Sequence, residues 1–597
     1  MIFQSEQPTL QKRTLDILRF APLGILVTTT VIFCLGAFRG FEITDESFYF
    51  LHYLYSREFF AGVSFFGLYF ELPFYLLNGS IPAIRIFGMC ILVSAALYFS
   101  MRLYSYCFFD RLLNIDKLAF VSTGTTGGFL YYGYFSTLNA PSYNLLVLVS
   151  MLLSTGVLLA ILENDRNNKK YYLLPIFYGL LISVCVFTKI PSSLYLVLSH
   201  VLFYFIVTNW NIRRFSYVFM LSLVGFVVNL AVVQLFFPDW FTVMMQGIEA
   251  VTLTDGRDVL LSFRVFSWDI QRSIFSNWMT YSIILGCYIF SLLMAARYKQ
   301  NLIGLIVLSL FISLTIWINM LDNHSTLYPI FFIVLTMLFL TIWITQKEQP
   351  DTSFFALITL LFLLPIGYSW GTNMSIADHS RMALIFPLAA CLILLKKLNF
   401  QAIITRKIYL VILFVACLPT FWLQIAPWVN LDYTYRLNAP LIEQKYPISI
   451  GNPSSTIFVD AVMRDNIVSF SKMLSSVNFA QGTPLLDLTG DSVGLVYAAA
   501  GKPVGVAWLF GGYPGSEKTF EYLIDSIDKT VLKSSWLMTS DDNPRHIKNW
   551  QTIWLRKLGE LNHQPVGTVC LHWPYVWGNP PDKNCYEVTL WKPSNLH

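Results

Sequence analysis

The sequence predicts a polytopic α-helical membrane protein with about 13 transmembrane helices, followed by an extracytoplasmic α/β domain. Two observations predict this fold class. Of the 597 residues, 55% are hydrophobic and only 13% are charged, which argues against a soluble multidomain protein. The apolar residues also form uncharged runs of about 20 residues, such as 20–38, 141–162 and 408–427, the length that crosses a hydrocarbon core as a helix. A membrane β-barrel would instead need alternating segments of about ten residues.

Hydropathy along the chain places the transmembrane helices one after another up to residue 427. The thirteen predicted helices lie at 20–38, 82–101, 118–138, 142–162, 171–188, 191–210, 215–237, 276–296, 301–321, 327–345, 353–370, 382–398 and 408–426. The twelve-residue apolar stretch Phe59–Phe70 is too short to span, so we interpret it as an interfacial helix. Residues 1–427 therefore form the predicted membrane domain.

Alternate connections between these helices carry Lys and Arg residues. Examples are Arg102 with Arg111, Arg213 with Arg214, and Lys396. Because cytoplasmic loops are enriched in Lys and Arg, this pattern places the N-terminus in the cytoplasm. An odd number of helices then places everything after residue 427 outside.

Residues 428–597 have the composition of a globular α/β domain. Short apolar runs at 456–459, 484–488 and 503–509 alternate with helical patterns at 517–529 and 546–558. Cys570 and Cys585 lie in this part, and they could form a disulfide if it faces an oxidising compartment. The other seven cysteines lie in or beside apolar runs and show no metal-ligand spacing, so they are interpreted as packing residues.

Net charge and motifs exclude several classes of partner and cofactor. The net charge is only +5 and the basic residues lie in short clusters between apolar runs, so nucleic acid is not an expected partner. The glycines around Asp491 do not form a dinucleotide-binding pattern. No cofactor is indicated, and a divalent metal is not supported by the ligand spacing.

The most informative segment is Arg39–Phe50, immediately outside the first predicted helix. It presents Glu42, Asp45 and Glu46 close to the membrane surface, followed by aromatic residues. These carboxylates could belong to an ordinary solvated loop. However, the segment is rich in Phe and Tyr, so the acids would lie against an apolar surface where an unpaired charge is costly.

At this point the chain resembles the GT-C superfamily of polytopic glycosyltransferases, which take sugar from a polyprenyl-phosphate carrier. The resemblance rests on Asp45-Glu46 followed by Tyr49, on Thr188-Lys189-Ile190-Pro191, and on His324–Pro329. The second and third of these are similar to elements of the aminoarabinose-transferase and protein-mannosyltransferase branches. The chain departs from some relatives at Thr137–Asn144, where they carry an acidic residue. A second acidic partner for catalysis is therefore in doubt.

The resemblance implies a role for each group of residues. Asp45 would be the base that takes a proton from the acceptor hydroxyl, and Glu46 would share this role or orient the acceptor. The lipid phosphate of the donor needs cations at the outer surface. The residues expected to bind that phosphate are Lys189, His324 and Arg381, with Arg257 and Arg85 second in rank, and those expected to bind the acceptor are Glu42, Tyr49, Trp508 and Trp573.

Ordinary structural roles compete with several of these predictions. Lys189 could extend to the lipid headgroups, and Arg257 lies close enough to Asp255 and Asp258 to form a surface ion pair. Arg85 could be an interfacial anchor. Trp508 and Trp573 could be packing aromatics rather than a platform for a glycan.

The predicted function is that of an inverting glycosyltransferase in a bacterial-type inner membrane. It would move a sugar from a polyprenyl-phosphate carrier to a cell-envelope glycan or glycolipid acceptor on the outer face. An O-antigen ligase or polymerase is an alternative, although such enzymes depend on basic residues in a late outer loop. A lipid or solute transporter is a third possibility, disfavoured because no inverted repeat is visible.

Overall fold

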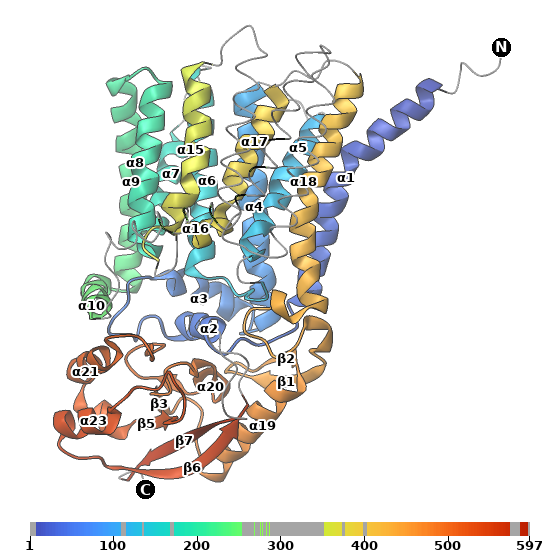
Figure 1. Cartoon of the computed structure of the whole chain (residues 1–597). Helices are drawn as coiled ribbons and strands as arrows, with labels where there is room; N and C mark the ends of the chain where they lie inside the picture. The colour runs from blue at the N-terminus through green and yellow to red at the C-terminus, as the bar shows by residue number, and fades with distance from the viewer. Residues whose placement is uncertain are drawn as a thin grey trace.

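The computed structural model describes most of the chain. The described residues are 7–108, 115–133, 136–166, 172–253, 351–372, 376–397, 403–572 and 585–594, with isolated residues between 268 and 286. Long helices form one layer, and a smaller domain that contains both described sheets lies at one end of them (Figure 1). The N-terminal end of the first helix points away from that domain, at the opposite end of the helical layer.

The helical layer is built from long apolar segments. Its helices are α1 (Gln7–Gly36), α4 (Ile81–Phe108), α5 (Ile115–Thr126) with the 3-10 turn η1 (Gly127–Gly133), α6 (Tyr143–Arg166), α7 (Leu173–Thr188), α8 (Ile190–Val207), α9 (Ile212–Phe236), α15 (Thr352–Ser369), α17 (Ile385–Lys397) and α18 (Ile403–Val429). In the described part of the chain, seven helices are long and apolar enough to cross a membrane. The predicted membrane character is thus supported by helix length and composition.

Ten of the thirteen predicted segments fall in described residues, and each of them coincides with a helix. The predicted segments 301–321 and 327–345 lie outside the described residues, and 276–296 does so except for the isolated residues 278, 282 and 286. The predicted helix 118–138 is not continuous, because α5 changes to a 3-10 turn at Gly127. A Cβ at Gly127 would lie 2.6 Å from Leu388, so the glycine lets this turn pack closely against α17.

The segment after α1 differs from the sequence prediction. Asp45 and Glu46 do not lie in an open loop but begin the helix α2 (Asp45–Tyr55). Acidic residues in a first helical turn are favoured by the helix dipole. The interfacial helix predicted at 59–70 instead occupies Phe66–Leu76 as α3, and residues 59–65 are irregular. Both α2 and α3 lie between the helical layer and the C-terminal domain (Figure 1).

The C-terminal domain contains two sheets. Strands β1 (Tyr446–Ile450) and β2 (Ser455–Val459) pair antiparallel. A five-stranded mixed sheet has the order β4-β3-β5-β7-β6, formed by β3 (Pro484–Asp487), β4 (Lys502–Pro503), β5 (Trp536–Thr539), β6 (His563–Leu571) and β7 (Tyr586–Pro593). Its helices are α19 (Ala461–Ser476), α20 (Val493–Ala498), α21 (Ser516–Ser526), α22 (Lys529–Ser534) and α23 (Trp550–Leu558). The strand predicted at 503–509 is wrong beyond Pro503, where the chain becomes irregular.

Packing continues from the membrane side into this domain. Phe50 of α2 lies 5.1 Å, ring to ring, from Tyr497 of α20. The backbone N–H of Gly494 donates to the carbonyl of Ile43 at 2.6 Å, and a Cβ at Gly494 would lie 2.7 Å from the Ile43 backbone. Because one apolar core includes residues of α2, α3 and the C-terminal sheet, the predicted boundary at residue 427 marks a change of composition and not a gap in packing.

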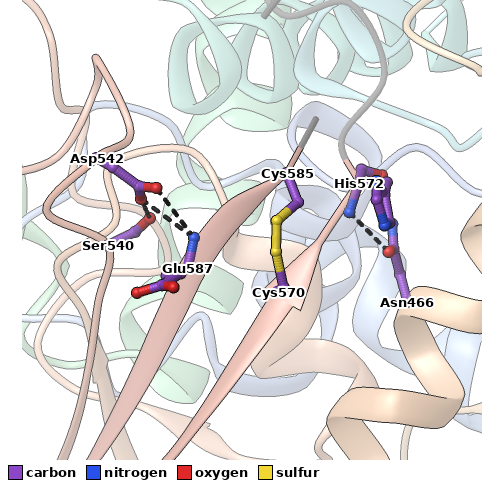
Figure 2. The surroundings of a disulfide bond; sticks show 7 residues. All are labelled: Asn466, Ser540, Asp542, Cys570, His572, Cys585 and Glu587. Atoms are coloured by element: carbon purple, nitrogen blue, oxygen red, sulfur yellow. Dashed lines mark hydrogen bonds between the residues drawn. A yellow bond between two sulfur atoms is a disulfide. The ribbon is translucent and has the colours of Figure 1, made fainter. Parts of the chain in front are cut away.

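A disulfide joins the two strands at the sheet edge. Cys570 of β6 and Cys585, just before β7, are bonded with their Cα atoms 5.6 Å apart (Figure 2). Nearby, the backbone N–H of His572 donates to the side chain of Asn466 on α19 at 2.9 Å. The disulfide that the sequence left open for these two cysteines is therefore present.

Candidate functional site

Three segments far apart in sequence meet where the helical layer contacts the C-terminal domain. The first is the acidic segment at the start of α2, and the second is the connection between η1 and α6. The third follows α18 and includes Tyr435 and Arg436. The backbone N–H of Tyr435 donates to the carbonyl of Ser136 at 2.8 Å and to Oγ1 of Thr137 at 3.0 Å. These bonds hold Tyr435 in place beside the acidic segment.

Asp45 is the most accessible acid of the cluster, with 26% of its side chain exposed. Its Oδ2 accepts a hydrogen bond from Oη of Tyr435 at 2.6 Å and from Nη1 of Arg436 at 3.0 Å. Both bonds reach the same oxygen, and Oδ1 has no hydrogen-bond partner among the described residues. Burial, followed by the charge of Asp45, raises the pKa of Tyr435 well above its ordinary value, so this hydroxyl remains a donor.

Glu42 is buried and accepts hydrogen bonds from residues of its own segment. Its carboxylate accepts hydrogen bonds from the Thr44 hydroxyl and from the backbone N–H groups of Thr44 at 3.0 Å and Glu46 at 2.9 Å. Burial raises the pKa of Glu42 to about 7, although Arg436, 3.9 Å away, acts in the opposite direction. With 1% exposure Glu42 is not presented to solvent, so its predicted contact with an acceptor would require movement.

Glu46 and Arg85 form an ion pair that the sequence did not predict. Arg85 Nε lies 2.8 Å from Glu46 Oε1, and Nη2 lies 2.5 Å from Oε2. The side chains of both residues are fully buried. Arg85 also donates to the carbonyls of Ala37 at 2.7 Å and Gly40 at 2.9 Å. This geometry gives the pair a structural role, anchoring α2 to α4, in place of the predicted contacts with acceptor and phosphate.

A group of aromatic side chains, here called the aromatic wall, follows Asp45; it consists of Phe48, Tyr49, Trp508 and Phe510. Phe48, one helical turn from Asp45 on α2, is partly exposed and lies 6.2 Å from Trp508 and 6.4 Å from Phe510. Trp508 is only 5% exposed and its indole N–H donates to the carbonyl of Gly490 at 2.9 Å. Tyr49 is 3% exposed. The predicted acceptor residues Trp508 and Tyr49 thus support the wall, while Phe48 and Phe510 form its accessible part.

A second polar cluster surrounds Lys189, at the junction of α7 and α8. Its ammonium donates to the carbonyl of Tyr368 at 2.8 Å and lies 5.6 Å from the centre of that ring. His379 stacks on Tyr368 at 5.5 Å and contacts Asn144 through Nε2 at 3.2 Å. Arg381, 8% exposed, donates through Nε to a backbone carbonyl at 3.1 Å. Of the predicted cations, Lys189 thus contacts Tyr368 at the end of α15, and Arg381 lies two residues after His379, which contacts the same tyrosine.

The start of α6 contacts both clusters. The ring of Tyr143 lies 6.3 Å from that of Tyr49, next to the acidic segment, and Asn144 contacts His379 of the second cluster at 3.2 Å. Three of the predicted residues, His324, Arg257 and Trp573, lie outside the described residues. Tyr435 and Arg436 were missed by the sequence analysis. The signal that could have drawn attention to them was an arginine in the first outer segment after the last predicted helix.

The C-terminal domain brings its own polar groups toward the same region. Asp487 is the last residue of strand β3 and Asp491 follows it, and the carboxyl ends of parallel strands are frequent binding positions. Asp491 accepts a hydrogen bond from Asn543 at 2.7 Å, and burial raises its pKa against the influence of Arg545 and Arg436. Within the described part of the chain, no three His, Cys, Asp or Glu side chains come together as a metal site.

No protein-family model, no curated protein and no solved structure matches this chain. The class that the fold and the site define is a helical membrane protein with a joined α/β domain and an acidic cluster between them. The function must be inferred from that cluster.

Proposed function

We propose that the chain is an inverting GT-C-type glycosyltransferase that moves a sugar from a polyprenyl-phosphate carrier to a cell-envelope glycan or glycolipid. The observation that supports this proposal is the hydrogen bonding and the exposure of the Asp45 carboxylate. Two donors hold its Oδ2, and Oδ1 has no hydrogen-bond partner among the described residues on a side chain that is 26% exposed. A fixed carboxylate with an available oxygen is what a general base requires.

In the proposed reaction the acceptor hydroxyl donates to Oδ1 of Asp45. The hydroxyl oxygen attacks the anomeric carbon of the donor sugar as the bond between that carbon and the phosphate oxygen breaks. The proton moves to Asp45, and the electron pair of the broken bond leaves with polyprenyl phosphate. Attack opposite the leaving group inverts the anomeric centre.

The leaving phosphate gains negative charge, which fixed cations stabilise in the transition state. Lys189 and Arg381 are the described residues proposed for this role. In the resting structure Lys189 donates to a backbone carbonyl at 2.8 Å, whereas Arg381 donates to a backbone carbonyl at 3.1 Å and lies 3.8 Å from the Asp378 carboxylate. A phosphate would therefore compete with a neutral acceptor at Lys189, and with a carbonyl and a carboxylate at Arg381. A charge-assisted hydrogen bond to phosphate is stronger than one to a carbonyl. Phe48 offers a partly exposed ring on which the sugar could stack.

The proposed topology places the N-terminus in the cytoplasm and the C-terminal domain on the outer face of a bacterial-type inner membrane. The disulfide between Cys570 and Cys585 supports an outer location, because disulfides persist in oxidising compartments. The opposite positions of the N-terminal end of α1 and the C-terminal domain agree with this arrangement.

The test replaces Asp45 by Asn, which keeps the size of the side chain and removes the base. Purified protein is supplied with undecaprenyl-phosphate-linked sugars and a membrane extract as acceptor, and release of undecaprenyl phosphate is measured by mass spectrometry. Loss of a positioned base should lower turnover by about 10²- to 10⁴-fold. Asp432→Asn, at an exposed acid close to Tyr435 in sequence, is the matched control and should retain activity. Undiminished turnover by Asp45→Asn would contradict the proposal.

A further inference from the structure

A separate helix lies where α9 ends, beside the C-terminal domain. This helix, α10 (Trp240–Thr252), follows α9 after the three residues 237–239. Figure 1 shows α10 nearly end-on, whereas α8 and α9 run along the helical layer. α10 therefore crosses the direction of the long helices at the level where α9 ends. This is the orientation of a helix that lies in a membrane–water interface.

One side of α10 packs on the protein. Val243 and Gly247 are buried. The backbone N–H of Gly62 donates to the carbonyl of Val243 at 3.1 Å, and a Cβ at Gly247 would lie 2.5 Å from the backbone of Gly62. Val243 also belongs to an apolar cluster with Phe65 and Phe237. This side is therefore closed to an external partner.

A second side of α10 presents three large apolar side chains, here called the α10 stripe. Phe241, Met245 and Ile248 are 57%, 48% and 41% exposed. At 3.6 residues per turn, these three side chains lie within about 60° of one another around the helix axis. Their spacing is that of an apolar stripe that normally packs against another apolar surface. No described part of the chain covers it.

The third side of α10 is polar and faces the C-terminal domain. Thr242 and Glu249 are exposed on it, and Oη of Tyr522 on α21 donates to Oε2 of Glu249 at 3.0 Å. Glu249 is the only charged residue of α10. The helix therefore has no cation that could attract acidic headgroups, so a membrane would hold it by apolar insertion.

The exposed surface of α9 leads directly to the α10 stripe. α9 is among the helices that are long and apolar enough to cross a membrane. At its end, Leu235 and Phe236 are 75% and 55% exposed. Only residues 237–240 separate Phe236 from the first residue of the stripe. The surface that the membrane span offers to lipid therefore continues onto α10.

We propose that the α10 stripe lies in the bilayer, among the acyl chains of the leaflet next to the C-terminal domain. Phe241, Met245 and Ile248 contact lipid, while Glu249 stays in the aqueous phase with Tyr522. The partner is the phospholipid surface, and a neutral phospholipid is sufficient because the contact uses no headgroup charge. The inference is independent of glycosyl transfer.

Attachment of α10 to the bilayer also holds the connection between α2 and α3. Gly62 of this connection is bonded to α10. Two residues later, the hydroxyl of Ser64 donates to the carbonyl of Thr188 at 2.8 Å. Thr188 directly precedes Lys189 of the second polar cluster. A membrane contact of α10 is therefore linked to that cluster through one short segment.

The experiment uses the full-length wild-type protein in phosphatidylcholine vesicles that contain a phosphatidylcholine with a diazirine on one acyl chain. After irradiation, lipid adducts are assigned to residues by peptide mass spectrometry. Three residues of nearly equal exposure are compared: Met245 at 48%, Val228 of α9 at 48% and Leu555 of α23 at 46%. Met245 should be labelled about as strongly as Val228 and about tenfold more than Leu555, because acyl chains reach only groups inside the bilayer.

Labelling of Met245 at the level of Leu555 would overturn the proposal. This outcome is expected if the stripe faces water, and also if another protein segment covers it. The comparison requires no variant to fold.

Two variants locate the contact. Met245→Asp combined with Ile248→Asp should lower the lipid labelling of Phe241 about tenfold, because carboxylates are costly among acyl chains. Labelling of Val228 should not change, which reports that the variant is folded and inserted. Thr242→Asp, on the polar side of α10, is the matched control and should keep the labelling of Phe241. Unchanged labelling of Phe241 in the double variant would also overturn the proposal.

Discussion

The buried ion pair between Arg85 and Glu46 leads to a prediction about folding stability. Its test also distinguishes a structural role of Arg85 from a role in phosphate binding. The two side chains are fully buried and make two direct contacts of 2.8 Å and 2.5 Å. Arg85 also donates hydrogen bonds to the carbonyls of Ala37 and Gly40. Replacing Arg85 by Met preserves most of the side-chain length and removes every one of these bonds.

The expected loss for Arg85→Met is about 3–5 kcal/mol of folding stability, because Glu46 would remain as a buried carboxylate without its partner. The double variant Arg85→Met with Glu46→Leu should recover part of this loss, since it removes the uncompensated charge. Recovery should be incomplete, because the carbonyls of Ala37 and Gly40 still lack a donor. The measurement is the unfolding midpoint of the full chain in detergent, followed by tryptophan fluorescence.

A matched control is available in the exposed pair of Arg57 and Glu71, whose side chains are 45% and 34% exposed. Arg57→Met should cost at most about 1 kcal/mol. If Arg85→Met unfolded at the wild-type midpoint and lost only affinity for a polyprenyl-phosphate donor, the structural role argued for Arg85 would be refuted. The phosphate-binding role expected from the sequence would then stand.

Two further predictions concern the C-terminal domain. Replacing Cys570 and Cys585 by Ser should lower stability by about 3 kcal/mol, since the bond closes a short loop with a sequence separation of 15; an unchanged unfolding midpoint under non-reducing conditions would contradict this. Asp487 has one carboxylate oxygen without a described partner, and burial raises its pKa to about 7 from an ordinary value near 3.8. The folded state therefore keeps its proton more tightly than the unfolded state, so the stability that Asp487 contributes is present at low pH and is lost as pH rises toward about 7. The unfolding midpoint of the wild-type protein should fall more between pH 5 and pH 8 than that of Asp487→Asn, and parallel pH profiles would disprove the assignment.

Local sequence patterns predicted the helices well, because apolar length is a property of each segment by itself. The same holds for strands 455–459 and 484–487, which coincide with short apolar runs. The prediction failed where tertiary contacts decide the conformation. Pro503–Leu509 is apolar enough for a strand, but beyond Pro503 it is irregular and places the ring of Trp508 6.2 Å from that of Phe48.

The candidate site was predictable only in part, for a related reason. Asp45 was identified from a local pattern of acids beside aromatic residues. Its partner Arg436 lies 391 positions away, and the partner of Glu46 lies 39 positions away, so neither pairing is visible in the spacing. A sequence pattern can propose which acids matter, but the pairing of each acid requires the fold.

That pairing is also what distinguishes the three acids of the cluster. Three carboxylates, those of Glu42, Asp45 and Glu46, face two guanidinium groups. Arg85 is committed to Glu46 on a fully buried contact, which leaves Arg436 for the other two. Arg436 is 3.0 Å from Asp45 but 3.9 Å from Glu42, and the pKa of Glu42 is accordingly still raised by burial to about 7. Glu42 can therefore retain a proton near neutral pH, and the carboxylate of Glu46 is paired with Arg85 inside the protein. Asp45 is the acid that combines a cationic partner with access to solvent. The distribution of two arginines among three acids thus makes Asp45 the best candidate for the base of the proposed reaction, a choice that an acidic motif in the sequence could not make by itself.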